Sequence, residues 1–138
     1  MQANSINEVI EKLEEIIAWS KVNKSRIGYF ATLYKRMTVA VKNGIVNNSF
    51  EDGNRMELLD VTFANRYLNA FNAYTNTQTC SNAWYKAFAA TGANNLIVLQ
   101  HIVLRMNTHI NLDLTIAAAE ACPCTNIYGI QNDFEKIN

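Results

Sequence analysis

The chain has 138 residues, a formal net charge of +0 and a pI of about 6.7. This length predicts one domain, residues 1–138. The balanced charge excludes the excess of basic residues that nucleic-acid binding requires. The longest uncharged apolar run, Leu96 to Leu104, is too short to span a bilayer, and residues 1–5 lack the basic and apolar regions of a signal peptide. Because three cysteines, Cys80, Cys122 and Cys124, form no closed disulfide framework, we expect free thiols and a cytoplasmic protein.

The first half of the chain predicts three amphipathic helices. The capping box Ser5-Ile6-Asn7-Glu8 begins the first, in which the apolar residues follow one stripe. The second is expected over about Ser25 to Asn43, with a helix stop at Gly44. Its packing seam consists of Ile27, Phe30, Tyr34, Met37 and Val41. The third is expected to begin near Asp52 or Gly53 and to end near Tyr74.

The second half predicts a short helix, a long one and a final short one. Ser81 is the expected cap of a helix that contains Trp84, interpreted as a core residue, and stops at Gly92. No glycine or proline interrupts Asn94 to Ala121, which is apolar nearly all round. We therefore expect one continuous helix at the centre of the fold, with over half of its residues buried. Cys122-Pro123-Cys124 should break it, and a last helix is expected over about Ile127 to Ile137.

The long helix contains both histidines of the protein, His101 and His109. His109 and Asp113 are four residues apart, so both point to one face of a helix. This spacing suits two ligands of one metal ion and equally suits a plain histidine–carboxylate hydrogen bond. The alternative to a metal is a buried polar network that fixes helix register and comprises His109, Asp113, Asn107, Asn111 and Arg105.

Asp60 is the carboxylate most expected to join this pair, because it lies on the core-facing stripe of Met56, Phe63 and Tyr67. Two aspartates and one histidine would suit Mg, Mn, Fe or Zn. The competing interpretation of Asp60 is a buried ion pair with Arg66 or Arg36, or a hydrogen bond to a tyrosine. His101 is two turns from His109 and points elsewhere on the helix, so it is not expected to bind the same ion.

Several blocks of sequence resemble a bacterial family described as domain of unknown function 5995. They are Ile97-Val98-Leu99-Gln100-His101, Met106-Asn107-Thr108-His109-Ile110-Asn111-Leu112-Asp113-Leu114, Tyr34-Lys35-Arg36-Met37-Thr38, Phe50-Glu51-Asp52-Gly53 and Asp60-Val61-Thr62-Phe63-Ala64-Asn65-Arg66-Tyr67. Arg105 stands where the family pattern has Gly, and Thr108 where it has Ala. The resemblance implies a helical bundle with no established activity, in a family whose members tend to extend further at the C-terminus. The run from His109 to Asp113 also looks like one helix of the zinc-dependent phospholipase C group, whose other histidines this chain lacks.

These observations predict an all-α, roughly five-helix bundle around residues 94–121. The candidate catalytic residues are His109 and Asp113, and the candidate metal ligands are His109, Asp113 and Asp60. Further pocket candidates are His101, Asn107, Asn111 and Arg66. One hypothesis is metal- or acid/base-assisted chemistry on a small or lipid-like molecule, with a divalent metal as the candidate cofactor. The other is a non-catalytic binding or assembly module, with a homo-oligomer as one form of assembly.

Overall fold

A computed structural model describes residues 1–92 and 96–137, and this part of the chain is helical with no strand. The all-α prediction is confirmed. None of its helices combines the length and apolarity needed to cross a bilayer. The α-helices are α1 (Ile6–Val22), α2 (Ile27–Val46), α3 (Gly53–Thr75), α4 (Asn82–Ala89), α5 (Val98–Thr108), α6 (Thr115–Ala121) and α7 (Gln131–Ile137). The other elements are the 3-10 helices η1 (Ala90–Gly92) and η3 (Cys124–Ile130) and the π-helix η2 (His109–Leu114).

Three helices begin at the polar residues that the sequence indicated. The side chains of Ser5, Asp52 and Ser81 each accept a hydrogen bond from the backbone N–H three residues further on, which satisfies one free donor of the first turn. The other half of the predicted capping box, in which Glu8 reaches back to the cap residue Ser5, is not formed as predicted. The Glu8 carboxylate accepts the backbone N–H of Asn4 at 2.8 Å, so it holds the segment before the cap.

The predicted helix stop at Gly44 is wrong, because α2 continues to Val46. The structure gives this glycine another role. A Cβ atom at Gly44 would lie 2.6 Å from Cε2 of Phe50, so the missing side chain lets the Phe50 ring pack against the helix. Met37, predicted to lie in the packing seam of α2, is 51% exposed.

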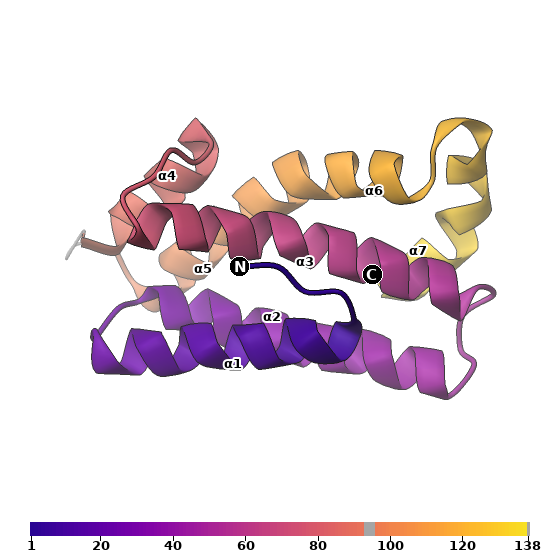
Figure 1. Ribbon diagram of the computed structural model, residues 1–138, viewed down its shortest axis with the longest axis horizontal. Helices are drawn as coiled ribbons and strands as arrows, with labels where there is room; N and C mark the ends of the chain where they lie inside the picture. The colour runs from indigo at the N-terminus through magenta and orange to yellow at the C-terminus, as the bar shows by residue number, and fades with distance from the viewer. Residues whose placement is uncertain (93–95, 138) are drawn as a thin grey trace.

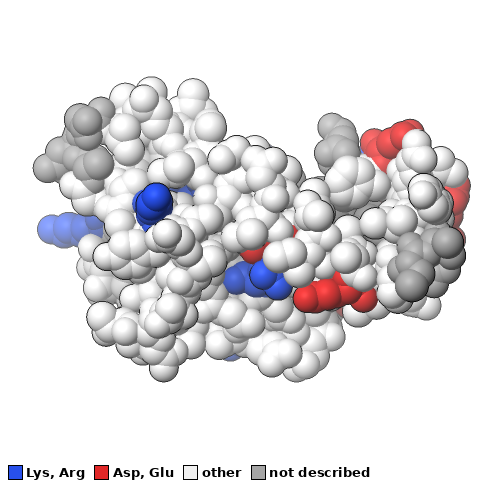
Figure 2. Space-filling model, turned by 90° about the horizontal axis from the view of Figure 1, so that it is seen from above, with Lys and Arg blue, Asp and Glu red and all other residues white. Residues whose placement is uncertain are grey.

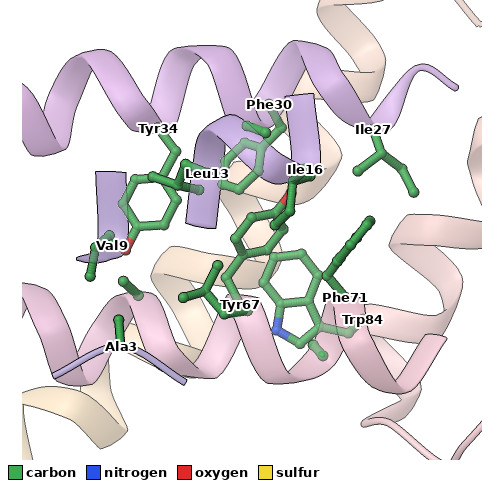
Figure 3. Close-up of a cluster of buried hydrophobic side chains, with 14 of the residues drawn as sticks. Ala3, Val9, Leu13, Ile16, Ile27, Phe30, Tyr34, Tyr67, Phe71 and Trp84 are labelled. Atoms are coloured by element: carbon green, nitrogen blue, oxygen red, sulfur yellow. The ribbon is translucent and has the colours of Figure 1, made fainter. Parts of the chain in front are cut away.

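Helix α3 lies in the middle of the molecule, with α1 and α2 on one side and α6 on the other, while α5 packs against α2 and α4 (Figure 1). The main core is rich in aromatic rings, with Phe30 and Tyr34 from α2 meeting Tyr67 from α3, and Phe71 of α3 belongs to the same cluster (Figure 3). Trp84 of α4 joins them and is 2% exposed, as predicted for a core residue. A smaller cluster of Met56, Leu59, Ala117, Cys122 and Ile130 extends the core toward the C-terminal segment.

The prediction of a central, mostly buried helix is wrong in two respects. First, α3 and not this run takes the central position. Second, most of the run is not buried. Helical structure does continue from Val98 to Ala121, although it widens to a π-helix at η2. Asn94 and Asn95, where the helix was predicted to begin, lie outside the described residues. Only six residues of the run are buried, namely His101, Arg105, Thr108, His109, Asp113 and Ala117.

The other side of this run faces outward, because α5, η2 and α6 pack against the bundle from one side. Leu99 and Val103 are 62% and 52% exposed, although both are apolar. Few charged side chains appear on the molecular face seen from above (Figure 2). The apolar sequence of this segment thus comes partly from exposed residues, while its buried stripe is mainly polar.

The break at Pro123 is confirmed, since α6 ends at Ala121 and Cys122 is its C-cap. The predicted last helix is divided between η3 and α7. Asp133 attaches α7 to the start of α3 by accepting the backbone N–H groups of Glu51 and Asp52. Cys80 and Cys122 are free thiols, as predicted, whereas the side chain of Cys124 lies outside the described part of the structure.

Candidate functional site

His109 and Asp113 form a buried pair on the π-helix η2. The distance from Nδ1 of His109 to Oδ2 of Asp113 is 2.9 Å, and the two residues are 3% and 1% exposed. The prediction that both point to one face is therefore correct. Single π-helical turns within α-helices occur often at functional sites, and here the turn coincides with the two residues that the sequence singled out.

Both carboxylate oxygens of Asp113 accept hydrogen bonds from other parts of the protein. Nε1 of Trp84 donates to Oδ2 at 2.8 Å, and Nε of Arg66 donates to Oδ1 at 3.1 Å. Arg66 also lies 3.8 Å from the carboxylate of Glu120 at the surface. The cation that neutralises Asp113 in this structure is thus an arginine, one of the residues predicted for the site.

The imidazole of His109 is enclosed by aromatic rings. Phe63 stacks on it, and Tyr34 and Phe30 meet it edge to face at centroid distances of 4.7 and 5.8 Å. Burial lowers the pKa of His109, while the hydrogen bond to Asp113 acts in the opposite direction. Because the carboxylate only accepts, a neutral ring has its proton on Nδ1. Nε2 then has its lone pair free, and this buried atom has no hydrogen-bond partner within the described residues.

Asp60 and Tyr34 form a second buried polar pair beside His109 and Asp113. Asp60 is 9% exposed, and burial, with a further contribution from the charge of Glu57, raises its pKa to about 7. Burial also raises the pKa of Tyr34, and the charges of Asp60 and Asp113 add to this effect. Oδ2 of Asp60 and the hydroxyl of Tyr34 are buried without a hydrogen-bond partner among the residues described.

The predicted three-residue metal centre is not assembled in the described structure. Asp60 makes no hydrogen bond to His109 or Asp113, and within residues 1–92 and 96–137 no three His, Cys, Asp or Glu side chains are grouped as metal ligands. The predicted partners of Asp60 are also elsewhere, because Arg66 binds Asp113 and Arg36 is exposed. A metal at His109, Asp113 and Asp60 stays a prediction that would need Asp113 to exchange its present partners.

A cavity of about 820 Å³ opens next to the buried pair. Its lining comes from α2, α3, η2, α6, α7 and the segment between α2 and α3. It is mainly apolar and includes Tyr34 and Asp60. Its size is within the range typical of small-molecule sites. Phe63 lines this cavity and stacks on His109, whereas His109 and Asp113 do not line it. The Phe63 ring therefore separates the histidine from the cavity.

The predicted polar network is wrong for three of its members. Asn107 and Asn111 are exposed, and Nδ2 of Asn111 donates to Oδ1 of Asn107 at 2.6 Å on the outer surface. Asn111 also lines the cavity. Arg105 is fully buried, but its Nη1 donates to the backbone oxygen of His101 at 2.7 Å, one turn earlier. Asn107 and Asn111 lie two positions before and after His109 and therefore point to other sides of the helix. Arg105 is four positions before His109, but its guanidinium donates to the preceding turn and not to Asp113.

His101 belongs to the environment of Arg105 and not to the site of His109. It is fully buried, and burial together with the charges of Arg105 and Arg26 lowers its pKa. Burial also lowers the pKa of Arg105, although the charges of Tyr67 and Tyr74 oppose this. His101 is not among the residues that line the cavity or among the hydrogen-bond partners of Asp113.

Three important residues were seen in the sequence only as parts of the core: Tyr34, Phe63 and Trp84. The sequence feature that could have identified two of them, Tyr34 and Trp84, is the polar group on each aromatic ring. A buried indole N–H or phenol O–H usually finds a partner, so each such residue on a core stripe predicts a nearby polar group. Asp113 is that partner for Trp84. Spacing within one helix could not identify it, because the two residues are 29 positions apart.

Residues 6–138 match a family model whose description is "Family of unknown function (DUF5995)". No curated protein matches the chain, and no solved structure does.

Proposed function

Since the chain belongs to the DUF5995 family, whose function is unknown, we propose from the geometry that it binds a small, largely apolar molecule in the 820 Å³ cavity. Tyr34 and Asp60 are the polar contacts of this molecule. The cavity walls include Met37, Met56 and Phe63, and methionine and aromatic side chains suit apolar ligands because they adapt their shape and expose large surfaces.

The observation that carries this proposal is the pair of unsatisfied polar groups at the cavity. A buried donor or acceptor without a partner costs about 1–3 kcal/mol. Among the residues that the structure describes, neither the hydroxyl of Tyr34 nor Oδ2 of Asp60 has a hydrogen-bond partner, and both residues line the cavity. A ligand with one polar end would provide partners for these atoms while its apolar part fills the remaining volume.

The direct test is binding of the neutral, polarity-sensitive dye Nile red, followed by its fluorescence. The variant Ala40→Trp should abolish binding, because Ala40 lines the cavity from an exposed position on α2 and an indole there would occupy the space. Asn43→Trp is the matched control, since Asn43 is exposed on the same helix and does not line the cavity. Equal dye binding by the wild type and both variants would reject the cavity as a binding site.

Acid/base chemistry at His109 and Asp113 is a second candidate function. It is favoured by the arrangement of the imidazole, in which Asp113 holds Nδ1 and Nε2 has no partner in the described structure. A general base positioned by a carboxylate has this form. Movement of Phe63, which stacks on His109 and lines the cavity, would open the imidazole to the cavity. Hydrolysis of p-nitrophenyl esters should then increase in Phe63→Ala and return to the background rate when His109→Gln is added; equal rates in all three proteins would exclude this candidate for esters.

A non-catalytic assembly module, a homo-oligomer and a cytoplasmic location stay predictions from the sequence. The exposed apolar residues of α5, such as Leu99 and Val103, are compatible with assembly. Sedimentation analysis of the purified protein would measure the oligomeric state.

A further inference from the structure

We propose that the ligand of this cavity has an ammonium group, which pairs with Asp60, on an apolar body. This inference rests on the proposed binding function and specifies the chemistry of the molecule. It is carried by the position of one buried carboxylate in a mainly apolar, aromatic cavity, to which no cation from the described part of the chain is bound.

The charge distribution around the cavity favours a cationic ligand. Asp60 is the acidic residue among those that line the cavity in the described structure. The two arginines that could have neutralised it are engaged or distant, because Arg66 binds Asp113 and Arg36 is exposed. A buried carboxylate without a counter-ion is costly, and removal of that cost contributes to binding of a cation.

Lys136 also lines the cavity and could in principle attract an anion. However, its Nζ donates to the backbone oxygen of Ser49 at 2.9 Å and lies 3.6 Å from Oδ1 of Asp133. Its side chain is 45% exposed. The lysine charge is thus partly neutralised by the protein and screened by water, whereas the carboxylate of Asp60 has neither compensation to the same degree.

The rings beside Asp60 suit the same ligand group. Tyr34 and Phe63 line the cavity with it, and Phe50 contributes a third ring. An ammonium group is attracted to the face of an aromatic ring, and this attraction is stronger when water is excluded. An ammonium has several N–H donors, so it can satisfy Oδ2 of Asp60 and the oxygen of Tyr34 together. An alcohol has one donor and no charge.

The test compares three probes with the same chain, octylamine, octanol and octanoate, at about pH 8, where Asp60 is ionised. Binding is measured by displacement of Nile red and by calorimetry. Octylamine should bind the wild type at least about tenfold more tightly than octanol, a difference of about 1.4 kcal/mol. Octanoate should bind most weakly, because Asp60 repels it.

The variant Asp60→Asn keeps the shape of the side chain and removes its charge, so it should make octylamine and octanol bind equally. Glu135→Gln is the control, since Glu135 is exposed between two cavity residues but does not line the cavity itself. It should retain the wild-type preference for the amine. The comparison of probes on the wild type does not depend on whether the Asp60 variant folds.

The outcomes separate the two proposals. If Nile red binds but octanol or octanoate matches or exceeds octylamine, or if no probe displaces the dye, the ammonium inference is overturned and the cavity remains a binding site. The same conclusion follows if Asp60→Asn retains the preference for the amine. If the dye itself does not bind to the wild type, the proposed binding function fails.

Discussion

The phenyl ring of Phe63 lies flat on the imidazole of His109, with the ring centroids 3.6 Å apart and the ring planes 7° apart. This stacking separates two polar regions that are close in space. On one side, His109 and Asp113 are buried with their protein partners. On the other, Asp60 and Tyr34 line a cavity and have buried polar atoms that no described residue hydrogen-bonds. The position of one ring therefore determines which polar groups a small molecule in the cavity can reach.

Replacement of Phe63 by leucine should raise the pKa of His109 toward its ordinary value. Leucine covers less of the imidazole, so water reaches the ring and burial penalises its protonation less. NMR titration of the two histidines measures this change. Phe50→Leu is the control, because Phe50 also lines the cavity but makes no ring contact with His109. An equal pKa of His109 in the two variants would contradict the shielding role of Phe63.

Asp113→Asn should lower the free energy of unfolding by about 2–3 kcal/mol, because charge-assisted hydrogen bonds from Trp84 and Arg66 lose their ionised acceptor. Denaturant unfolding measures the loss. Glu120→Gln removes the other carboxylate near Arg66, at an exposed site, and should cost less than about 1 kcal/mol. Equal effects of the two substitutions would mean that the buried contacts of Asp113 contribute little.

Metal analysis of the Asp113→Asn variant independently tests the predicted metal centre. Protein donors already bind both carboxylate oxygens, so wild type and variant purified without added metal should contain equal, substoichiometric amounts of divalent metal. Stoichiometric metal in the wild type that is lost from the variant would restore the hypothesis of a metal centre at His109, Asp113 and Asp60.

Asp60 should make the protein less stable as the pH rises from about 4 to about 7. Its pKa in the folded state, about 7, is above the ordinary value of 3.8, so between these values the folded state binds more protons than the unfolded state. Stability from the protonated carboxyl is then complete below the unfolded value and is lost as the pH rises through the folded one. Asp60→Asn should gain stability relative to wild type over this range, by up to about 4 kcal/mol at 1.36 kcal/mol per pKa unit. Denaturation curves at several pH values test this, and a difference independent of pH would refute it.

Asp133→Ala should release α7 from the start of α3. The carboxylate accepts the N–H groups of Glu51 and Asp52 at 2.6 and 3.1 Å and pairs with Arg55 at 3.4 Å. Burial alone would raise the pKa of Asp133, but these donors hold it below the ordinary value. Loss of the contacts should cost about 2–3 kcal/mol and expose α7 to proteolysis. Glu135→Ala, at an exposed position of α7, should leave the cleavage rate unchanged; equally rapid cleavage of both variants would contradict the role of Asp133.

Local features of the sequence were sufficient for the helical class, three helix starts and the His109–Asp113 pair. Ser5 and Ser81 act within the first turn of their own helices, and His109 and Asp113 are neighbours through helical spacing. In each case the interacting groups are at most four residues apart. The geometry of a single helix then decides the contact, whatever the rest of the chain does.

Tertiary packing decided the rest of the site. Gly44 lies within α2, where the missing side chain leaves room for the Phe50 ring, and the apolar residues Leu99 and Val103 are exposed because only one side of α5 meets the bundle. The pairing of Asp113 with Trp84 and Arg66, and the cavity beside Asp60, depend on how helices distant in sequence are placed. Composition and periodicity identify residues that favour burial, but the free energy of a buried charge depends on which partner lies within hydrogen-bonding distance, and only the folded chain brings that partner there.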